Sequence, residues 1–206
     1  MEGMANMKDN EYDLAIIDPP YGIGEDGKGN TRHRNSPPFT EFKVKGWDRI
    51  RPNKKYFNEL FRISENQIIW GGNYFVNYLR PKMGWIYWDK LLGGDFSDGE
   101  LAYTSFERAL KKFTKSPEKN YSTNKYSAMK WKRIHPTQKP VALYKWLLKN
   151  YAKPGDKILD THLGSGSIAI ACWDMGFDLT GYEIDKDYFD AMTKRFENHK
   201  KQLQLF

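Results

Sequence analysis

Asp18-Pro19-Pro20-Tyr21 is the stretch of the sequence whose residue types most clearly suggest chemistry. Leu14 to Ile17, directly before it, are four apolar residues in a row, which predicts a short strand buried on both faces. The prolines lack an N–H group and must end that strand, so the Asp18 carboxylate and the Pro19 carbonyl become candidate acceptors. Two acceptors on the N–H bonds of an aromatic amino group would free its lone pair to attack a methyl group, and Tyr21 offers a ring for stacking. A rigid turn after a strand is the structural alternative, and the tetrapeptide alone does not decide between the two.

A second candidate site lies near the end of the sequence, where a glycine turn follows a predicted strand at residues 157–160. Gly164-Ser165-Gly166 leads into a helix, where backbone N–H groups can meet a ligand. Glu183 stands at the end of the next strand, about 20 residues after the turn, where an acid can bind both hydroxyls of a ribose. The turn and the acid fit S-adenosylmethionine or, with Ala169 as a third small residue, a dinucleotide such as NAD.

The charge of the chain favours a polyanionic partner such as nucleic acid, because its 206 residues carry a formal net charge of +7. Residues 105–134 are the most basic section, and their interleaved aromatic residues suit a nucleic-acid backbone with exposed bases. Residues 22–49 are rich in glycine and proline, and we expect a mobile loop that faces DNA. A solvated face and a surface insertion are the structural alternatives for these two segments. The nucleic-acid contacts expected from them are Arg32, Arg34, Lys111, Lys112, Lys130, Lys132 and Arg133.

The sequence also argues against several classes of site and location. Cys172 is the single cysteine, which excludes an internal disulfide, and the four histidines lack metal-ligand spacing. We therefore expect Cys172 to be a small core residue, and no metal to be bound. No apolar stretch reaches the length of a membrane span, and the N-terminus lacks a signal-peptide core, which predicts a cytoplasmic protein.

Several motifs together resemble the amino-group DNA methyltransferases, which methylate adenine N6 or cytosine N4. The Asp18 tetrapeptide resembles the catalytic motif of that family, and residues 69–73 and 88–90 resemble stretches that follow it there. His135-Pro136-Thr137-Gln138-Lys139-Pro140 closely resembles the segment that precedes the cofactor-binding motif in these enzymes. The catalytic motif comes first in the chain, an order similar to that of the circularly permuted β class.

The resemblance implies an enzyme that transfers a methyl group from S-adenosylmethionine to an amino group in DNA, as restriction–modification methyltransferases do. Asp18, Pro19, Pro20 and Tyr21 would hold the target base after it swings out of the duplex. No hydride-transfer site is evident, so S-adenosylmethionine is preferred to NAD. Thr161-His162 departs from the family, which usually has Pro-Phe at these positions. The cofactor contacts that the resemblance implies are Thr137, Lys139, Asp160, His162, Gly164, Ser165, Gly166 and Glu183.

Adenine is the expected target, because Asp at the first position of the tetrapeptide is typical of the adenine enzymes. The cytosine-N4 enzymes more often carry Ser at that position, and cytosine is the second expectation. An RNA methyltransferase and a nucleic-acid-binding protein without catalysis are the alternatives from other classes.

The fold expected is a single doubly wound, Rossmann-like α/β domain with helices on both faces of a largely parallel sheet. Residues 12–104 would form its catalytic half, 105–134 the basic recognition segment and 135–206 the cofactor-binding half. In the family, one further strand lies beyond the strand that bears the ribose-binding acid. Neither residues 1–12 nor 202–206 resemble a strand, so we expect that edge strand to be absent, as it would be if the gene product started upstream. The exposed edge at residues 178–183 would then favour self-association, for example as a homodimer.

Overall fold

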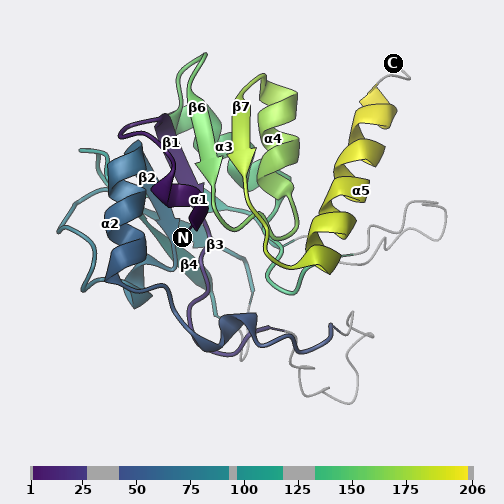
Figure 1. Cartoon of the computed structure of the whole chain (residues 1–206), viewed down its shortest axis with the longest axis horizontal. Helices are drawn as coiled ribbons and strands as arrows, with labels where there is room; N and C mark the ends of the chain where they lie inside the picture. Colours follow the sequence, from purple (N-terminus) through teal and green to yellow (C-terminus); the bar gives the residue numbers. More distant parts are fainter. Residues whose placement is uncertain (1, 27–41, 93–96, 118–132, 204–206) are drawn as a thin grey trace.

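In the computed structural model, seven strands form one mixed sheet that carries helices on both faces (Figure 1). The structure describes residues 2–26, 42–92, 97–117 and 133–203. The strands lie in the order β5-β3-β4-β2-β1-β6-β7, with four parallel and two antiparallel pairings. They are β1 (Tyr12–Ile17), β2 (Ser64–Trp70), β3 (Trp85–Asp89), β4 (Gly99–Thr104), β5 (Lys111–Thr114), β6 (Lys157–Asp160) and β7 (Asp178–Gly181).

The described residues also form five α-helices and two short 3-10 helices. They are α1 (Glu2–Ala5), η1 (Trp47–Arg49), α2 (Lys54–Ile63), η2 (Gly72–Tyr74), α3 (Val141–Tyr151), α4 (Ser167–Met175) and α5 (Lys186–Leu203). The sequence predicts a helix over residues 73–79, and this prediction is wrong. The chain there makes successive turns with i to i+3 hydrogen bonds, because Asn73 and Asn77 favour turns and Phe75 is drawn into the core.

The strand before Asp18 lies in the middle of the sheet, as its sequence predicts. β1 pairs in parallel with β2 on one side and with β6 on the other. Leu14 and Ile16 pack into the core on one face, and Ala15 and Ile17 pack into the core on the other. Because β1 and β6 are parallel neighbours, Asp18 and Asp160 end up at the same edge of the sheet.

Helices cover the two faces separately, which confirms the doubly wound α/β architecture. Helices α3 and α4 pack on one face, where Leu147 and Ile168 are almost fully buried. Helices α1 and α2 cover the other face, with Leu60 and Ile63 buried beneath them. Cys172 is a buried core residue of α4, as expected.

The two edges of the sheet differ from each other. Within the described ranges, no strand pairs with the outer side of β7, which agrees with the expected absence of an edge strand there. At the opposite edge of the sheet lies β5, which pairs in parallel with β3. Sequence reasoning missed β5 because it has only four residues, three of them exposed, and no apolar alternation.

Of the helices in the described residues, none has the length and apolar character needed to cross a membrane.

Candidate active site

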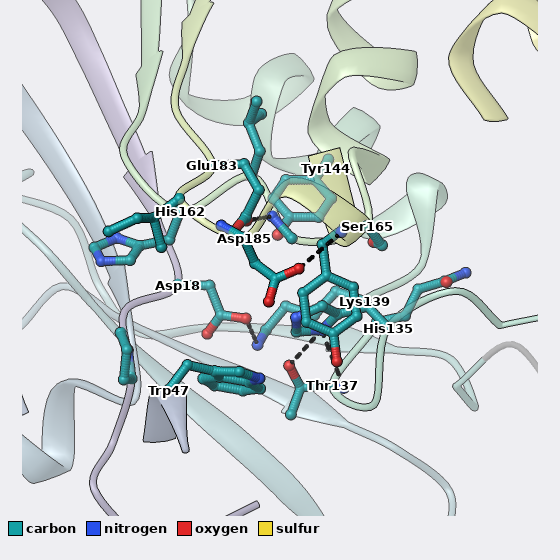
Figure 2. A pocket seen from close by; sticks show the side chains of 16 residues that line it. Asp18, Trp47, His135, Thr137, Lys139, Tyr144, His162, Ser165, Glu183 and Asp185 are labelled. Atoms are coloured by element: carbon teal, nitrogen blue, oxygen red, sulfur yellow. Dashed lines mark hydrogen bonds and ion pairs between the residues drawn. The ribbon is translucent and has the colours of Figure 1, made fainter. Parts of the chain in front are cut away.

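A pocket opens at the carboxyl edge of the sheet, between the end of β1 and the turn after β6. Figure 2 shows Asp18 and Lys139 in contact, with His162 and Glu183 on one side of them and Trp47 on the other. The space between its lining residues amounts to about 620 Å³ when the part open to solvent is included. It is lined by Asp18, Pro20 and most of the residues expected to bind a cofactor, namely Thr137, Lys139, His162, Gly164, Ser165 and Glu183.

The Asp18 carboxylate is held by two donors. Lys139 Nζ lies 2.6 Å from Oδ2, and the Tyr21 hydroxyl donates to Oδ1 at 2.6 Å. Burial raises the pKa of Asp18 above its ordinary value, and Lys139 opposes this effect. Lys139, expected only as a cofactor contact, is therefore also the direct partner of the Asp18 carboxylate.

Lys139 is shared with a second acid that sequence reasoning missed. Glu100, on β4, lies 3.0 Å from Lys139 Nζ and 2.5 Å from Lys90 Nζ. Burial alone would lower the pKa of Lys139, but Asp18 and Glu100 outweigh it and raise that pKa. For Glu100 the effects have the opposite sign: burial alone would raise its pKa, but Lys139 and Lys90 together lower it. The sequence carries no signal for this contact, because Glu100 and Lys139 meet only in the folded sheet.

The Tyr21 ring lies beside the pocket and is not part of its lining. It stacks on Tyr74 with ring centroids 5.0 Å apart and meets the edge of Phe75 at 6.2 Å. Gly71 makes this position possible, since a Cβ there would lie 2.2 Å from Tyr21 Cε1. One face of the Tyr21 ring is thus covered by protein, and stacking of a base on the ring stays a prediction.

The glycine turn and Glu183 are joined by hydrogen bonds. Glu183 Oε2 accepts from the Gly164 N–H, and Oε1 accepts from the Asp185 N–H, each at 2.8 Å. Gly166 lies outside the pocket lining, and it has a left-handed φ of +66° at the start of α4. A Cβ on Gly166 would lie 2.1 Å from Met192 Cγ, so this glycine lets α5 pack closely against the turn.

Asp160 lies behind the pocket, and its Oδ1 accepts from the His162 N–H at 2.9 Å. Burial raises the pKa of Asp160 to about 8. His162 itself lines the pocket, and burial lowers its pKa to about 4, so its ring is neutral at pH 7. Thr161 explains the departure from the family pattern, because its hydroxyl links His162 Nδ1, at 2.9 Å, to the Tyr56 hydroxyl, at 2.6 Å.

The segment 135–140 packs against both halves of the chain. His135 lies between Trp47 and Tyr188, with ring centroids 5.2 and 4.4 Å away. Burial lowers the pKa of His135 to about 3, so it also is neutral at pH 7. Sequence reasoning missed Trp47 and Tyr188 as lining residues, because nothing local marks two aromatics so far apart in the chain.

The described ends of the 22–49 loop are fixed to the rest of the protein. Asp48 is buried and accepts hydrogen bonds from the backbone N–H groups of Gly22, Ile23 and Glu25. Lys45 Nζ lies 2.6 Å from Asp185, beside the pocket. Lys45 belongs to the 22–49 segment that was expected to face DNA, whereas the structure pairs it with Asp185 and Asp187 near the start of α5.

The residues expected to contact DNA lie at the β5 edge of the sheet, beside the 135–140 segment, or beyond the described ranges. Lys111 and Lys112 belong to β5, and Lys112 Nζ lies 3.3 Å from Asp89. Because β5 is parallel to β3, and β3 runs in the direction of β2, the chain leaves β5 at the edge that carries the pocket. The Arg133 guanidinium donates to the Pro136 carbonyl. The remaining candidates, Arg32, Arg34, Lys130 and Lys132, lie outside the described residues.

The donor and acceptor groups of the pocket fit S-adenosylmethionine. Glu183 supplies a carboxylate for ribose hydroxyls, and the exposed Ile184 beside it supplies an apolar surface for a flat base. Asp18 and Asp185 also line the pocket, and His135 and His162 are neutral. A cationic sulfonium would find carboxylates and uncharged rings there, while the one lining lysine among the described residues, Lys139, is paired with Asp18 and Glu100. In the parts of the chain that the structure describes, no group of three His, Cys, Asp or Glu residues is placed to hold a metal ion.

Comparisons with known proteins find relatives among the DNA methyltransferases. Over 96% of its length, the chain is 26% identical to the type II methyltransferase M.HpaI of Haemophilus parainfluenzae, and the match covers 72% of that protein. It is 34% identical to the DNA adenine methyltransferase YhdJ of Escherichia coli (strain K12), over 47% of this chain and 36% of YhdJ.

Solved structures share the fold. The M1.HpyAVI–SAM complex superposes with a TM-score of 0.59 at 20% identity, covering 94% of this chain and 92% of that one. The cytosine-N4-specific PvuII DNA methyltransferase gives a TM-score of 0.60 at 13% identity, covering 96% of this chain and 86% of that one. The profile of the DNA methylase family that acts on N6 and N4 matches residues 63–194. The chain belongs to this family of S-adenosylmethionine-dependent amino DNA methyltransferases.

Proposed function

We propose that this enzyme methylates the N6 amino group of adenine in duplex DNA. The observation that carries the proposal is that the Asp18 carboxylate opens into the same pocket as Glu183 and the glycine turn. An aspartate at the first position of the tetrapeptide is typical of adenine enzymes. The similarity to YhdJ, which is named as an adenine methyltransferase, points in the same direction.

Asp18 and Pro19 would act on the target amino group once the base has left the duplex. S-adenosylmethionine supplies an electrophilic methyl group on a sulfonium ion. The Asp18 carboxylate and the Pro19 carbonyl would accept the two N–H bonds, which turns the nitrogen lone pair towards the incoming methyl group. Asp18 would then take the proton that the nitrogen releases. Holding the reactants in this geometry contributes much of the rate enhancement.

The basic residues around β5 would bind the DNA backbone. Lys111 and Lys112 lie on the edge strand that leads the chain to the pocket side of the sheet. Neutralising three of the four lysines Lys111, Lys112, Lys130 and Lys132 is expected to flatten the dependence of log K on log salt by about 0.9 per lost phosphate contact. Binding titrations from 50 to 300 mM salt would measure this slope. An unchanged slope would mean that these lysines form a solvated face.

Methyl incorporation into different nucleic acids tests the proposed substrate. We would incubate the purified chain with radiolabelled S-adenosylmethionine and either duplex DNA or RNA of mixed sequence, and then identify methylated nucleosides by mass spectrometry. N6-methyladenine in DNA is the expected product. Methyl groups found only on cytosine N4, or only in RNA, would replace the proposal with one of those two activities.

An enzyme of this kind would act on DNA in the cytoplasm. Because no strand of the described residues pairs with the outer edge of β7, we expect a homodimer, which sedimentation velocity at micromolar concentration would detect. A monomer at all concentrations would refute that expectation without affecting the proposed reaction.

A further inference from the structure

We propose that Lys139 and Glu100 form a charge-sharing pair that sets how readily Asp18 accepts the proton released from the target amine. Lys139 is the positioning residue of the catalytic Asp18 carboxylate. Glu100 is the second counter-ion of Lys139, and it weakens the electrostatic stabilisation that Lys139 gives to ionised Asp18. The inference deepens the proposed function, since it rests on Asp18 acting on an amino nitrogen.

The geometry of the pair carries the proposal. The Lys139 side chain is 2% exposed, and its ammonium lies 2.6 Å from Asp18 and 3.0 Å from Glu100. Glu100 Oε1 in turn lies 2.5 Å from Lys90 Nζ, so positive and negative side chains alternate along this row. Asp18 follows β1, Glu100 lies on β4 and Lys139 lies just before α3, so this alternation of charges exists only in the folded protein.

A buried ammonium paired with Asp18 alone would hold that carboxylate too firmly in its ionised form. An opposite charge within 4–6 Å typically lowers the pKa of an acid by about 1–3 units. Glu100 divides the interaction of Lys139 between two carboxylates and so leaves Asp18 able to take up a proton. When it does, Lys139 still has Glu100 as its counter-ion, and no unpaired charge is left buried.

The proton balance of the step is simple. A nitrogen–carbon bond forms as the carbon–sulfur bond breaks, its electron pair stays on sulfur, and one N–H proton passes to an Asp18 oxygen. Each carboxylate oxygen has lone pairs beyond those used by Lys139 and Tyr21, so the carboxylate can still receive the amine. Asp18 later returns the proton to solvent.

Other titratable groups also face the Asp18 carboxyl. These are Tyr21 on the same loop, Tyr144 on α3 and Asp160 on β6. All three are present in every variant compared below, but they also respond to the pair: Glu100 adds to the raised pKa of Tyr21 and of Tyr144, and Lys139 opposes the raised pKa of Asp160.

The test compares Lys139→Met and Glu100→Gln with the wild type in single-turnover methyl transfer between pH 5 and 9. In Lys139→Met, the pH below which the rate falls on the acid side of the profile should rise by about 1–3 units, and the reaction at pH 7 should slow by about 100-fold or more. In Glu100→Gln, the same pH is expected to decrease. Lys186→Met, which removes an exposed ion pair with Asp190 on α5, serves as the matched control and keeps the wild-type profile. Acid limbs that coincide, or that move in the same direction in both variants, would overturn the proposal.

Thermal unfolding without cofactor or DNA gives a readout that does not depend on activity. In Lys139→Met the buried Asp18 loses its cation while Glu100 keeps Lys90, so Asp18 gains a proton on folding and the melting temperature falls more at pH 8 than at pH 5. Glu100→Gln keeps the Asp18–Lys139 pair and should show a smaller difference between these pH values. Equal differences would refute the charge-sharing pair. Wild-type protein that methylates no nucleic acid would instead refute the proposed function, while unfolding would still decide on the pair.

Discussion

Glu183→Gln tests the cofactor site at the residue that the structure ties most directly to the glycine turn. A carboxylate offers about four lone-pair positions, and the two backbone N–H groups of Gly164 and Asp185 use one on each oxygen. Each oxygen can therefore still accept a ribose hydroxyl. Glutamine keeps one acceptor oxygen and places an NH₂ donor where the other was, so one backbone N–H and one hydroxyl lose their acceptor.

The expected loss follows from these contacts. A hydrogen bond to a charged group contributes about 1.5–3 kcal/mol, which corresponds to about 10- to 150-fold in the dissociation constant for S-adenosylmethionine. Isothermal titration calorimetry without DNA would measure it, with Glu197→Gln on α5 as a control for loss of a surface carboxylate. At saturating cofactor the single-turnover rate should approach that of the wild type. Unchanged affinity in Glu183→Gln would refute the ribose role of this residue.

Three further outcomes are expected. Asp18→Ala should slow single-turnover methyl transfer by about 100- to 1,000-fold while calorimetry finds nearly unchanged cofactor affinity, and near-wild-type turnover would remove Asp18 from the mechanism. Gly71→Ala would place a Cβ 2.2 Å from the Tyr21 ring at a left-handed φ of +64°, so urea unfolding should show a loss of about 1–3 kcal/mol; unaltered stability would mean that Tyr21 moves freely. Asp160 has a folded pKa of about 8, above its ordinary 3.8, so its contribution to stability is present below pH 3.8 and lost as the pH rises through 8. The melting temperature of Asp160→Asn, taken relative to that of the wild type at the same pH, should therefore be higher at pH 8 than at pH 5. An equal difference from the wild type at both pH values would contradict the raised pKa.

Much of the fold could be predicted because its central strands have unambiguous local patterns. Leu14 to Ile17 must be buried on both faces, and the strand they form does lie between two parallel neighbours. Gly166 and Gly176 bound α4 with left-handed backbones, which only glycine adopts at little cost. β5 escaped prediction because strand formation there depends on pairing with β3, and its own residues carry little strand preference.

The candidate site could be predicted residue by residue, but its internal contacts could not. The motifs indicated Asp18, Lys139 and Glu183 separately, and six of the eight expected cofactor residues line one pocket. The pairing of Lys139 with Asp18 and Glu100 arises from sheet order, which brings β1 and β4 within reach of one side chain. No sequence motif predicts this contact, because Asp18, Glu100 and Lys139 lie far apart along the chain.

The parallel pairing of β1 with β6 has a consequence for how the enzyme matures. The Asp13 carboxylate accepts from the backbone N–H of Lys157, 144 residues later in the chain, at the start of this ladder. A loop of that length must close before the two strands meet, and pairings of such high sequence separation form slowly. During synthesis the backbone N–H and C=O groups on one side of β1 therefore stay without their β6 partners until Lys157–Asp160 has left the ribosome. The pocket between the end of β1 and the turn after β6 can form only once that pairing is made.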